Sequence, residues 1–131
     1  MISRNTSGNG MTLSAPMEGK DVRVHLSRAA IQALTLRTTP LVAEMELYFS
    51  CLIRLQVRFH EDREAATPVS DKLAIRFHPV AGRRCDLHAV DEQPLDDFPI
   101  VRRQSFVPHW LDIDYRKGEW VGKFGYRNAL T

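Results

Sequence analysis

The feature that most constrains the fold is a strict alternation of apolar and polar side chains between residues 44 and 60. Every odd position from Met45 to Phe59 is apolar, and the even positions other than Tyr48 and Leu52 are clearly polar. A period of two matches a β-strand, whereas a helix would spread both sets around its circumference. We therefore predict that this segment is β-structure.

The length of the alternating segment predicts an interruption within it. A straight strand through 45–59 would reach about 50 Å at ~3.3 Å per residue, beyond the ~17–20 Å that strands usually span. A bend, a bulge or a tight turn must therefore divide it. Ser50-Cys51 is the predicted position of that break.

The N-terminal part of the chain predicts a tail followed by one domain. Residues 1–19 are rich in Ser, Asn, Thr and Gly, so they bury too little apolar surface to offset the entropy of ordering, and we predict disorder. Residues 20–128 are predicted to form a single α+β domain, because 131 residues suffice for one hydrophobic core. Ser27 is a good N-cap for a helix that would end near residue 37.

The C-terminal part predicts a β-hairpin whose register can be argued from the side chains. Pairing Tyr115 with Trp120 gathers the apolar residues on one face and sets Asp112 opposite Lys123 on the other. A connection of two or four residues around Lys117-Gly118 gives this register. Further strands are predicted at 22–26, 73–78 and, more weakly, 84–90.

These elements together predict an α+β fold. It would consist of a mainly antiparallel sheet of about six strands, partly curled, with one short helix at about 27–37 and a C-terminal β-hairpin. A sheet that is apolar on one face must cover it by curling, with the helix or with a second subunit. We therefore expect a protein partner or self-association.

Charge and composition narrow the cellular setting. The formal net charge is +2, which implies neither nucleic acid nor an anionic membrane. No apolar run approaches the ~20 residues of a membrane span, and the N-terminus lacks a secretory signal, so we expect a cytoplasmic protein without a membrane partner. Cys51 and Cys85 form neither a metal-type repeat nor a C-x-x-C pair, which favours a reducing compartment, although a disulfide between them stays open.

Metal binding is the first chemical hypothesis. Four side chains are competent ligands: Cys51, His78, Cys85 and His88. Cys85 and His88 lie three apart, so in a strand they would point to opposite faces, and a shared ion would require a turn. Cys51 also continues the apolar stripe, as a small core residue would. The candidate metal ligands are therefore Cys51, Cys85 and His88. We expect no cofactor, and the alternative is zinc or an iron–sulfur cluster bound by these residues.

Nucleic-acid binding is the second hypothesis, and it rests on basic residues with aromatic residues nearby in sequence. Basic side chains on a sheet beside stacking aromatic rings suit single strands. The residues concerned are Arg76, Arg83, Arg84, Arg102, Arg103, Arg116 and Lys117, with Trp110, Trp120 and Tyr126. Acidic residues interleave with them, and the predicted register turns most of the aromatic rings toward the core. A mixed-charge surface is the favoured interpretation, and we do not expect a nucleic-acid partner.

Catalysis is the third hypothesis, and the sequence contains no nucleophile elbow, phosphate loop or H-E-x-x-H helix. Asp112 and Asp114 share a strand face and could act as paired carboxylates. Lys123, opposite Asp112, indicates cross-strand charge pairing instead. The catalytic residues stay unknown, and we expect a non-enzymatic accessory or protein-interaction domain.

Two stretches resemble a known family, over residues 22–60 and 110–128. A strand, a Ser-Arg-Ala-Ala helix from Ser27 and a strand ending near Cys51 are followed by Leu111–Tyr115, with Gly122 and Phe124 after it. This order is similar to HesB-type (A-type) iron–sulfur carrier proteins. The resemblance implies Cys51 as a cluster ligand. The terminal cysteine pair of that family has no counterpart in this sequence, so the resemblance implies a cluster held between subunits.

Overall fold

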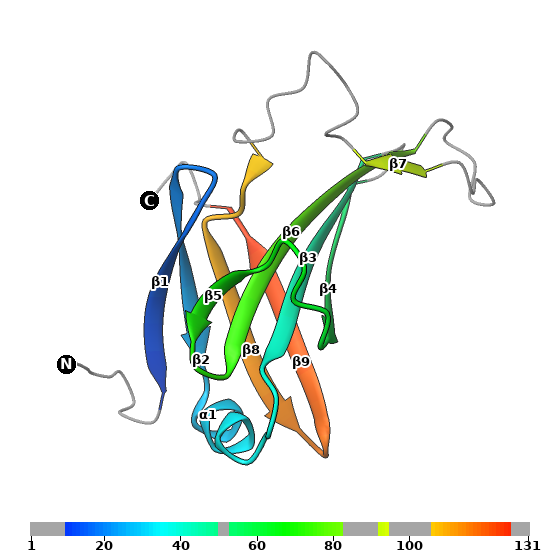
Figure 1. Cartoon of the computed structure of the whole chain (residues 1–131). Coiled ribbons are helices and arrows are strands. Elements are labelled where there is room, and N and C mark those ends of the chain that lie inside the picture. The colour runs from blue at the N-terminus through cyan, green and yellow to red at the C-terminus, as the bar shows by residue number, and fades with distance from the viewer. Residues whose placement is uncertain (1–9, 50–52, 83–91, 95–105, 127–131) are drawn as a thin grey trace.

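A computed structural model describes residues 10–49, 53–82, 92–94 and 106–126 of the chain. These residues form two facing β-sheets and one α-helix (Figure 1). The first sheet has the order β1-β2-β8-β9, with β1 at Met11–Met17, β2 at Lys20–Leu26, β8 at Trp110–Arg116 and β9 at Glu119–Gly125.

The second sheet has the order β4-β3-β6-β5, and a short strand β7 also pairs with β6. Its strands are β3 (Leu41–Phe49), β4 (Arg54–His60), β5 (Thr67–Ser70), β6 (Leu73–Gly82) and β7 (Glu92–Pro94). The two sheets meet at both edges, because β4 contacts β9 and β1 contacts β5. The result is a flattened, two-layered sandwich with mixed sheets.

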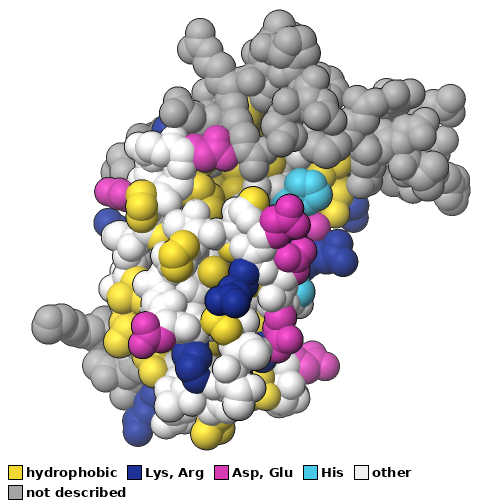
Figure 2. All heavy atoms as spheres, in the orientation of Figure 1, with side chains coloured by type: hydrophobic (Ala, Val, Ile, Leu, Met, Phe, Trp, Pro, Cys, Tyr) yellow, Lys and Arg dark blue, Asp and Glu magenta, His cyan; other side chains and the backbone are white. Residues whose placement is uncertain are grey.

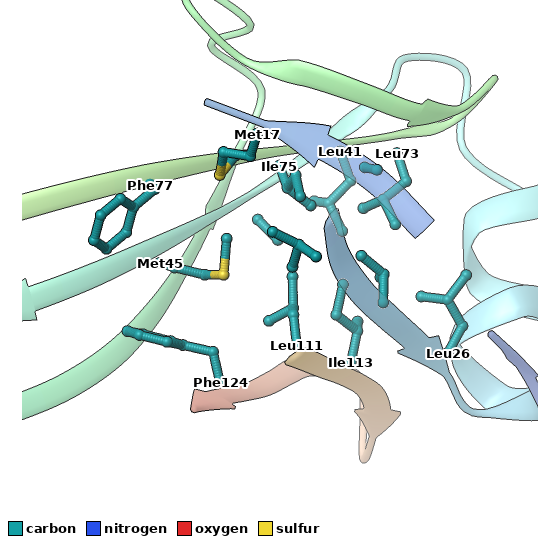
Figure 3. Close-up of a cluster of buried hydrophobic side chains, with 14 of the residues drawn as sticks. Met17, Leu26, Leu41, Met45, Leu73, Ile75, Phe77, Leu111, Ile113 and Phe124 are labelled. Atoms are coloured by element: carbon teal, nitrogen blue, oxygen red, sulfur yellow. The ribbon is translucent and has the colours of Figure 1, made fainter. Parts of the chain in front are cut away.

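The hydrophobic core fills the space between the sheets (Figure 3). Met45 of β3 and Ile75 of β6 face Leu111 and Ile113 of β8, and all four side chains are less than 2% exposed. The helix α1 (Arg28–Thr35) lies at the lower end of the sandwich in Figure 1 and packs against β8 and β2. Each sheet thus covers the apolar face of the other, which accounts for the one-sided pattern of the sequence.

The α+β class is confirmed, but the predicted arrangement of about six antiparallel strands is only partly right. The described residues form nine strands, and β2 with β8 and β3 with β6 pair in parallel. Parallel partners are joined by long connections and leave no local turn signal in the sequence. The sheets are therefore mixed. Two sheets packed face to face take the place of the single, partly curled sheet that we predicted.

The predicted disorder of residues 1–19 is wrong for Met11–Met17, which forms β1. Ala15 and Met17 are buried, and Pro16 is tolerated because β1 is an edge strand. A two-residue turn at Glu18 and Gly19, both with positive φ, joins β1 to β2. Small side chains in this strand made its alternation hard to recognise in the sequence. Residues 1–9 lie outside the described part.

The predicted break in the alternating segment is confirmed, because β3 ends at Phe49 and β4 begins at Arg54. The positions 50–52 themselves lie outside the described residues. β3 and β4 form an antiparallel pair in which Met45 opposes Val57 and Leu47 opposes Leu55. Odd positions therefore oppose odd positions, which is why one alternating pattern continues through both strands.

The predicted helix and C-terminal hairpin are both confirmed. The Ser27 side chain caps α1 by accepting a hydrogen bond from the backbone N–H of Ala30, at 3.1 Å. In the hairpin Tyr115 opposes Trp120, and a two-residue turn with positive φ at Lys117 and Gly118 joins the strands. Within the described part of the chain, no helix combines the length and the apolar character needed to cross a membrane.

Candidate metal centre

Two buried glutamates mark the outer face of the second sheet. Glu44 and Glu46 lie on β3, on the face opposite to the core residues Met45 and Leu47. Their side chains are nevertheless only 9% and 3% exposed. The cause is the position of β3, which runs between β4 and β6 (Figure 1). Side chains of both neighbouring strands lie beside the two glutamates. Buried carboxylates are rare unless they are paired or bind a metal.

The strand register explains which side chains surround the two glutamates. Glu44 lies opposite Arg58 of β4 and Arg76 of β6. Glu46, two residues further along the same face, lies opposite Gln56 of β4 and His78 of β6. Directly opposed side chains in a sheet have Cβ atoms about 4.5–5.5 Å apart, so these polar groups are brought together by strand pairing alone.

Glu44 is held by three cationic or hydrogen-bonding groups. Its Oε1 accepts hydrogen bonds from Arg76 Nη2 at 2.8 Å and lies 2.7 Å from His60 Nε2. Its Oε2 lies 3.1 Å from His78 Nδ1. Burial alone would raise the pKa of Glu44, but the hydrogen bonds from Arg76 and His60 bring it below its ordinary value of 4.5. The carboxylate is therefore ionised at neutral pH.

Glu46 has a separate set of partners. Its Oε1 accepts a hydrogen bond from Tyr48 Oη at 3.0 Å and a longer one from Gln56 Nε2 at 3.4 Å. Its Oε2 lies 3.2 Å from Arg58 Nη1 and 3.9 Å from His78 Nδ1. The carboxylate of Glu46 raises the pKa of the Arg58 guanidinium. Both glutamates thus have their orientation fixed by neighbouring side chains.

His78 supplies a nitrogen atom that points at the two carboxylates without a hydrogen bond. Its Nδ1 atom is shielded from solvent and makes no hydrogen bond with suitable geometry to a described residue, although it lies 3.1 Å from Glu44 Oε2. The ring as a whole is 40% exposed. A shielded polar atom without a hydrogen bond costs about 1–3 kcal/mol, and a cation bound at this nitrogen would remove that cost.

The three side chains together have the geometry of a metal site. One ligand atom from each of Glu44, Glu46 and His78 lies within 4.8 Å of the others. Ligands 2.0–2.1 Å from a tetrahedral zinc ion are about 3.3 Å apart, and the distances from His78 Nδ1 to Glu44 Oε2 and Glu46 Oε2, 3.1 and 3.9 Å, bracket that value. The side chains that bind the glutamate oxygens would hold these ligands in place, because the residues around a metal site orient the ligands of the ion by hydrogen bonds.

The charged character of this region is visible on the molecular surface. In Figure 2, acidic, basic and histidine side chains gather on the side where Figure 1 shows β3, β4 and β6. Arg58 is 60% exposed at its side chain, and the guanidinium of Arg54 lies 5.1 Å from the centre of the Tyr48 ring. The buried carboxylates are thus bordered by exposed cations.

The metal ligands predicted from the sequence are different residues from those of this cluster. Cys51, Cys85 and His88 all lie outside the described residues, so their predicted role stays a prediction. His78 was recognised in the sequence as a competent ligand, but Glu44 and Glu46 were assigned only to a polar face. The available signal was a pair of acidic residues two apart inside a strongly apolar run from Leu41 to Phe49.

Asp112 and Asp114, the predicted pair of carboxylates, lie on the outer face of the other sheet. They line an open groove of about 270 Å³ together with His25 and Lys123. The hydroxyl of Ser27 donates a hydrogen bond of 2.6 Å to Asp114, and the pKa of Asp114 is lowered, chiefly by that bond. Asp112 opposes Lys123 as predicted. Asp114 is thus engaged in local structure, which favours the structural interpretation of this pair.

Several residues of the nucleic-acid hypothesis are engaged in contacts within the described structure. Arg76 is bound to Glu44, and Arg116 is paired with Asp114 through a contact of 2.9 Å. Tyr126 donates a hydrogen bond to the backbone carbonyl of Phe106. The remaining basic candidates, Arg83, Arg84, Arg102 and Arg103, lie outside the described residues.

Comparison of the chain with family models, with curated proteins and with solved structures finds no significant match. The resemblance to HesB-type carriers accordingly stays a prediction.

Proposed function

We propose that this chain is a non-enzymatic accessory domain that binds one divalent metal ion through Glu44, Glu46 and His78. The observation that carries the proposal is the shielded Nδ1 atom of His78, which faces two carboxylates and has no hydrogen bond to a described residue. A cation between these three atoms would satisfy the nitrogen and use both carboxylates. Two strands, β3 and β6, supply the ligands, so the site is formed as soon as the sheet pairs.

The mixture of donor atoms favours zinc among the common divalent ions. An imidazole nitrogen and two carboxylate oxygens suit Zn²⁺, which binds both types at about 2.0–2.2 Å. Mg²⁺ prefers oxygen ligands in octahedral geometry and gives up its water reluctantly. We therefore expect bound zinc to resist displacement by a large excess of Mg²⁺.

Equilibrium dialysis against Zn²⁺, followed by metal analysis, tests the proposal. We expect one zinc ion per chain in the unaltered protein, and a large loss of zinc in His78→Gln and in Glu46→Gln. His25→Gln is the matched control, because His25 lies on the other sheet with Nδ1 3.1 Å from Thr12 Oγ1. Circular dichroism of each variant shows whether it is folded.

Two results would contradict the proposal. Folded protein that takes up no zinc would leave the cluster as an ion-pair network alone. Zinc that stays bound after both His78→Gln and Glu46→Gln would indicate other ligands, with Cys51, Cys85 and His88 as the next candidates. His78→Gln guards against a folding artefact, because its ring is partly exposed whereas Glu46 is buried.

A further inference from the structure

The charge around the proposed metal site indicates a second ligand. The carboxylates of Glu44 and Glu46 match the two charges of a divalent ion, but each carboxylate is already paired with an arginine. Arg76 Nη2 lies 2.8 Å from Glu44, and Arg58 Nη1 lies 3.2 Å from Glu46. Loading the site with a divalent metal ion therefore adds two positive charges beside carboxylates that the arginines already neutralise.

The coordination of the metal leaves room for such a ligand. Three protein side chains occupy three positions of a tetrahedral zinc ion and leave the fourth open to water or an incoming group. Arg58 is 60% exposed at its side chain, so its guanidinium can meet a ligand from solvent. Guanidinium groups present several N–H donors in a fork that matches the oxygens of phosphate.

We propose that the metal-loaded site binds a phosphate group, with one oxygen at the open metal position and others at Arg58. The inference rests on the proposed metal binding. Phosphate fits because a phosphate monoester carries about two negative charges near neutral pH, which equals the charge that the metal ion adds. An acetate ion carries one charge and leaves the site unbalanced.

The proposal makes phosphate binding dependent on the metal. Without a metal ion, Glu44 and Glu46 neutralise Arg76 and Arg58, so the face offers little attraction for a dianion. With the metal bound, the same carboxylates are shared between the cation and the arginines. Because binding linkage is reciprocal, phosphate must also tighten the binding of zinc by the factor by which zinc tightens the binding of phosphate.

The test measures the binding of inorganic phosphate to zinc-loaded protein freed of excess zinc, and to metal-free protein. We expect binding to the zinc-loaded form at least about tenfold tighter than to the metal-free form, and tighter than the binding of acetate. Arg58→Gln, saturated with zinc, should lose at least about tenfold in phosphate affinity. Its zinc affinity is measured alongside, because Arg58 also binds Glu46 Oε2. Arg54→Gln is the matched control, because it removes the same charge from the same face of β4 while Arg54 stacks on Tyr48.

The outcomes separate this inference from the metal proposal beneath it. Zinc binding without phosphate binding would overturn the inference alone. Equal phosphate binding with and without zinc, or an equal loss in Arg54→Gln and Arg58→Gln, would also overturn it, since each would mean a general attraction to basic side chains. Failure to bind zinc at all would overturn both.

Discussion

At the scale of single residues, the two glutamates of β3 are stable in their buried positions because each carboxylate has hydrogen-bond partners. Moving a carboxylate out of water costs several kcal/mol, and hydrogen bonds with opposite charges are needed to offset that cost. Arg76 and His60 supply them for Glu44, while Tyr48 and Arg58 supply them for Glu46. The nitrogen of His78 is the exception, and it is the atom on which the metal proposal depends.

Ser27 joins two structural elements through one hydroxyl group. It caps α1 at the N–H of Ala30 and donates to Asp114 of β8. We expect Ser27→Ala to lower the free energy of unfolding by about 1 kcal/mol through loss of the cap, measured by urea denaturation at neutral pH. Thr35→Ala is the control, because the Thr35 hydroxyl donates to a carbonyl within the exposed side of the same helix, and its removal should have little effect.

The same substitution should change the response to acid. The pKa of Asp114 is lowered in the folded protein, so its contribution to stability is present above its ordinary value of 3.8 and is lost as the pH falls through the folded value. Ser27→Ala removes the largest cause of that shift. The stability difference between the two proteins should therefore shrink below pH 3.8. A difference that grows in acid would contradict this assignment.

Tyr126 should govern part of the response to alkali. Burial raises its pKa from 10.0 to about 12, and its hydroxyl donates to the carbonyl of Phe106. Because the folded value is the higher one, the stabilisation is complete below pH 10 and is lost as the pH rises toward 12. Urea denaturation across this range should show a steeper loss in the unaltered protein than in Tyr126→Phe. Identical slopes would refute the assignment.

At the scale of strands and helices, patterns in the sequence predicted those features that depend on interactions between residues close in the chain. The alternation from Met45 to Phe59 predicted two strands with a break, and the pairing of Tyr115 with Trp120 predicted the hairpin register, because both follow from side-chain period and turn chemistry. The parallel pairs of β2 with β8 and β3 with β6 depend on packing between distant segments. No feature of either strand alone could indicate them.

The candidate site could be predicted only in part for the same reason. A polar side chain on an outer sheet face can be covered by its neighbours only on a central strand, and the sequence does not say which strand is central. Glu44 and Glu46 are buried because β4 and β6 flank β3 on both sides. His78 was identified as a possible ligand from its chemistry, whereas its neighbours follow from the β3–β6 register.

The hairpin of β8 and β9 offers a test at the same scale. Gly125 lies opposite Trp110, and a Cβ atom at this position would come within 2.5 Å of the indole ring. We expect Gly125→Ala to displace the ring and to cost about 1–3 kcal/mol of stability, with a change in tryptophan fluorescence. Val121→Ala, on the same strand at a side chain that is 38% exposed, should change stability by less than about 0.5 kcal/mol. Equal effects of the two would contradict the packing described.

At the scale of the whole molecule, the inner and outer faces of the two sheets have different roles. The inner faces of both sheets form the hydrophobic core (Figure 3), and the outer face of the second sheet carries the buried acidic pair with its cations. The predicted need for a partner to cover an apolar sheet face is met within the described residues by the second sheet. Self-association thus stays a prediction without a surface assigned to it.

X-ray absorption at the zinc edge tests the central claim most directly, because it identifies the atoms around the metal. We expect nitrogen and oxygen neighbours at about 2.0–2.2 Å, with the outer scattering of one imidazole ring that disappears in His78→Gln. Sulfur neighbours at about 2.3 Å would instead assign the metal to cysteine and would contradict binding by Glu44, Glu46 and His78.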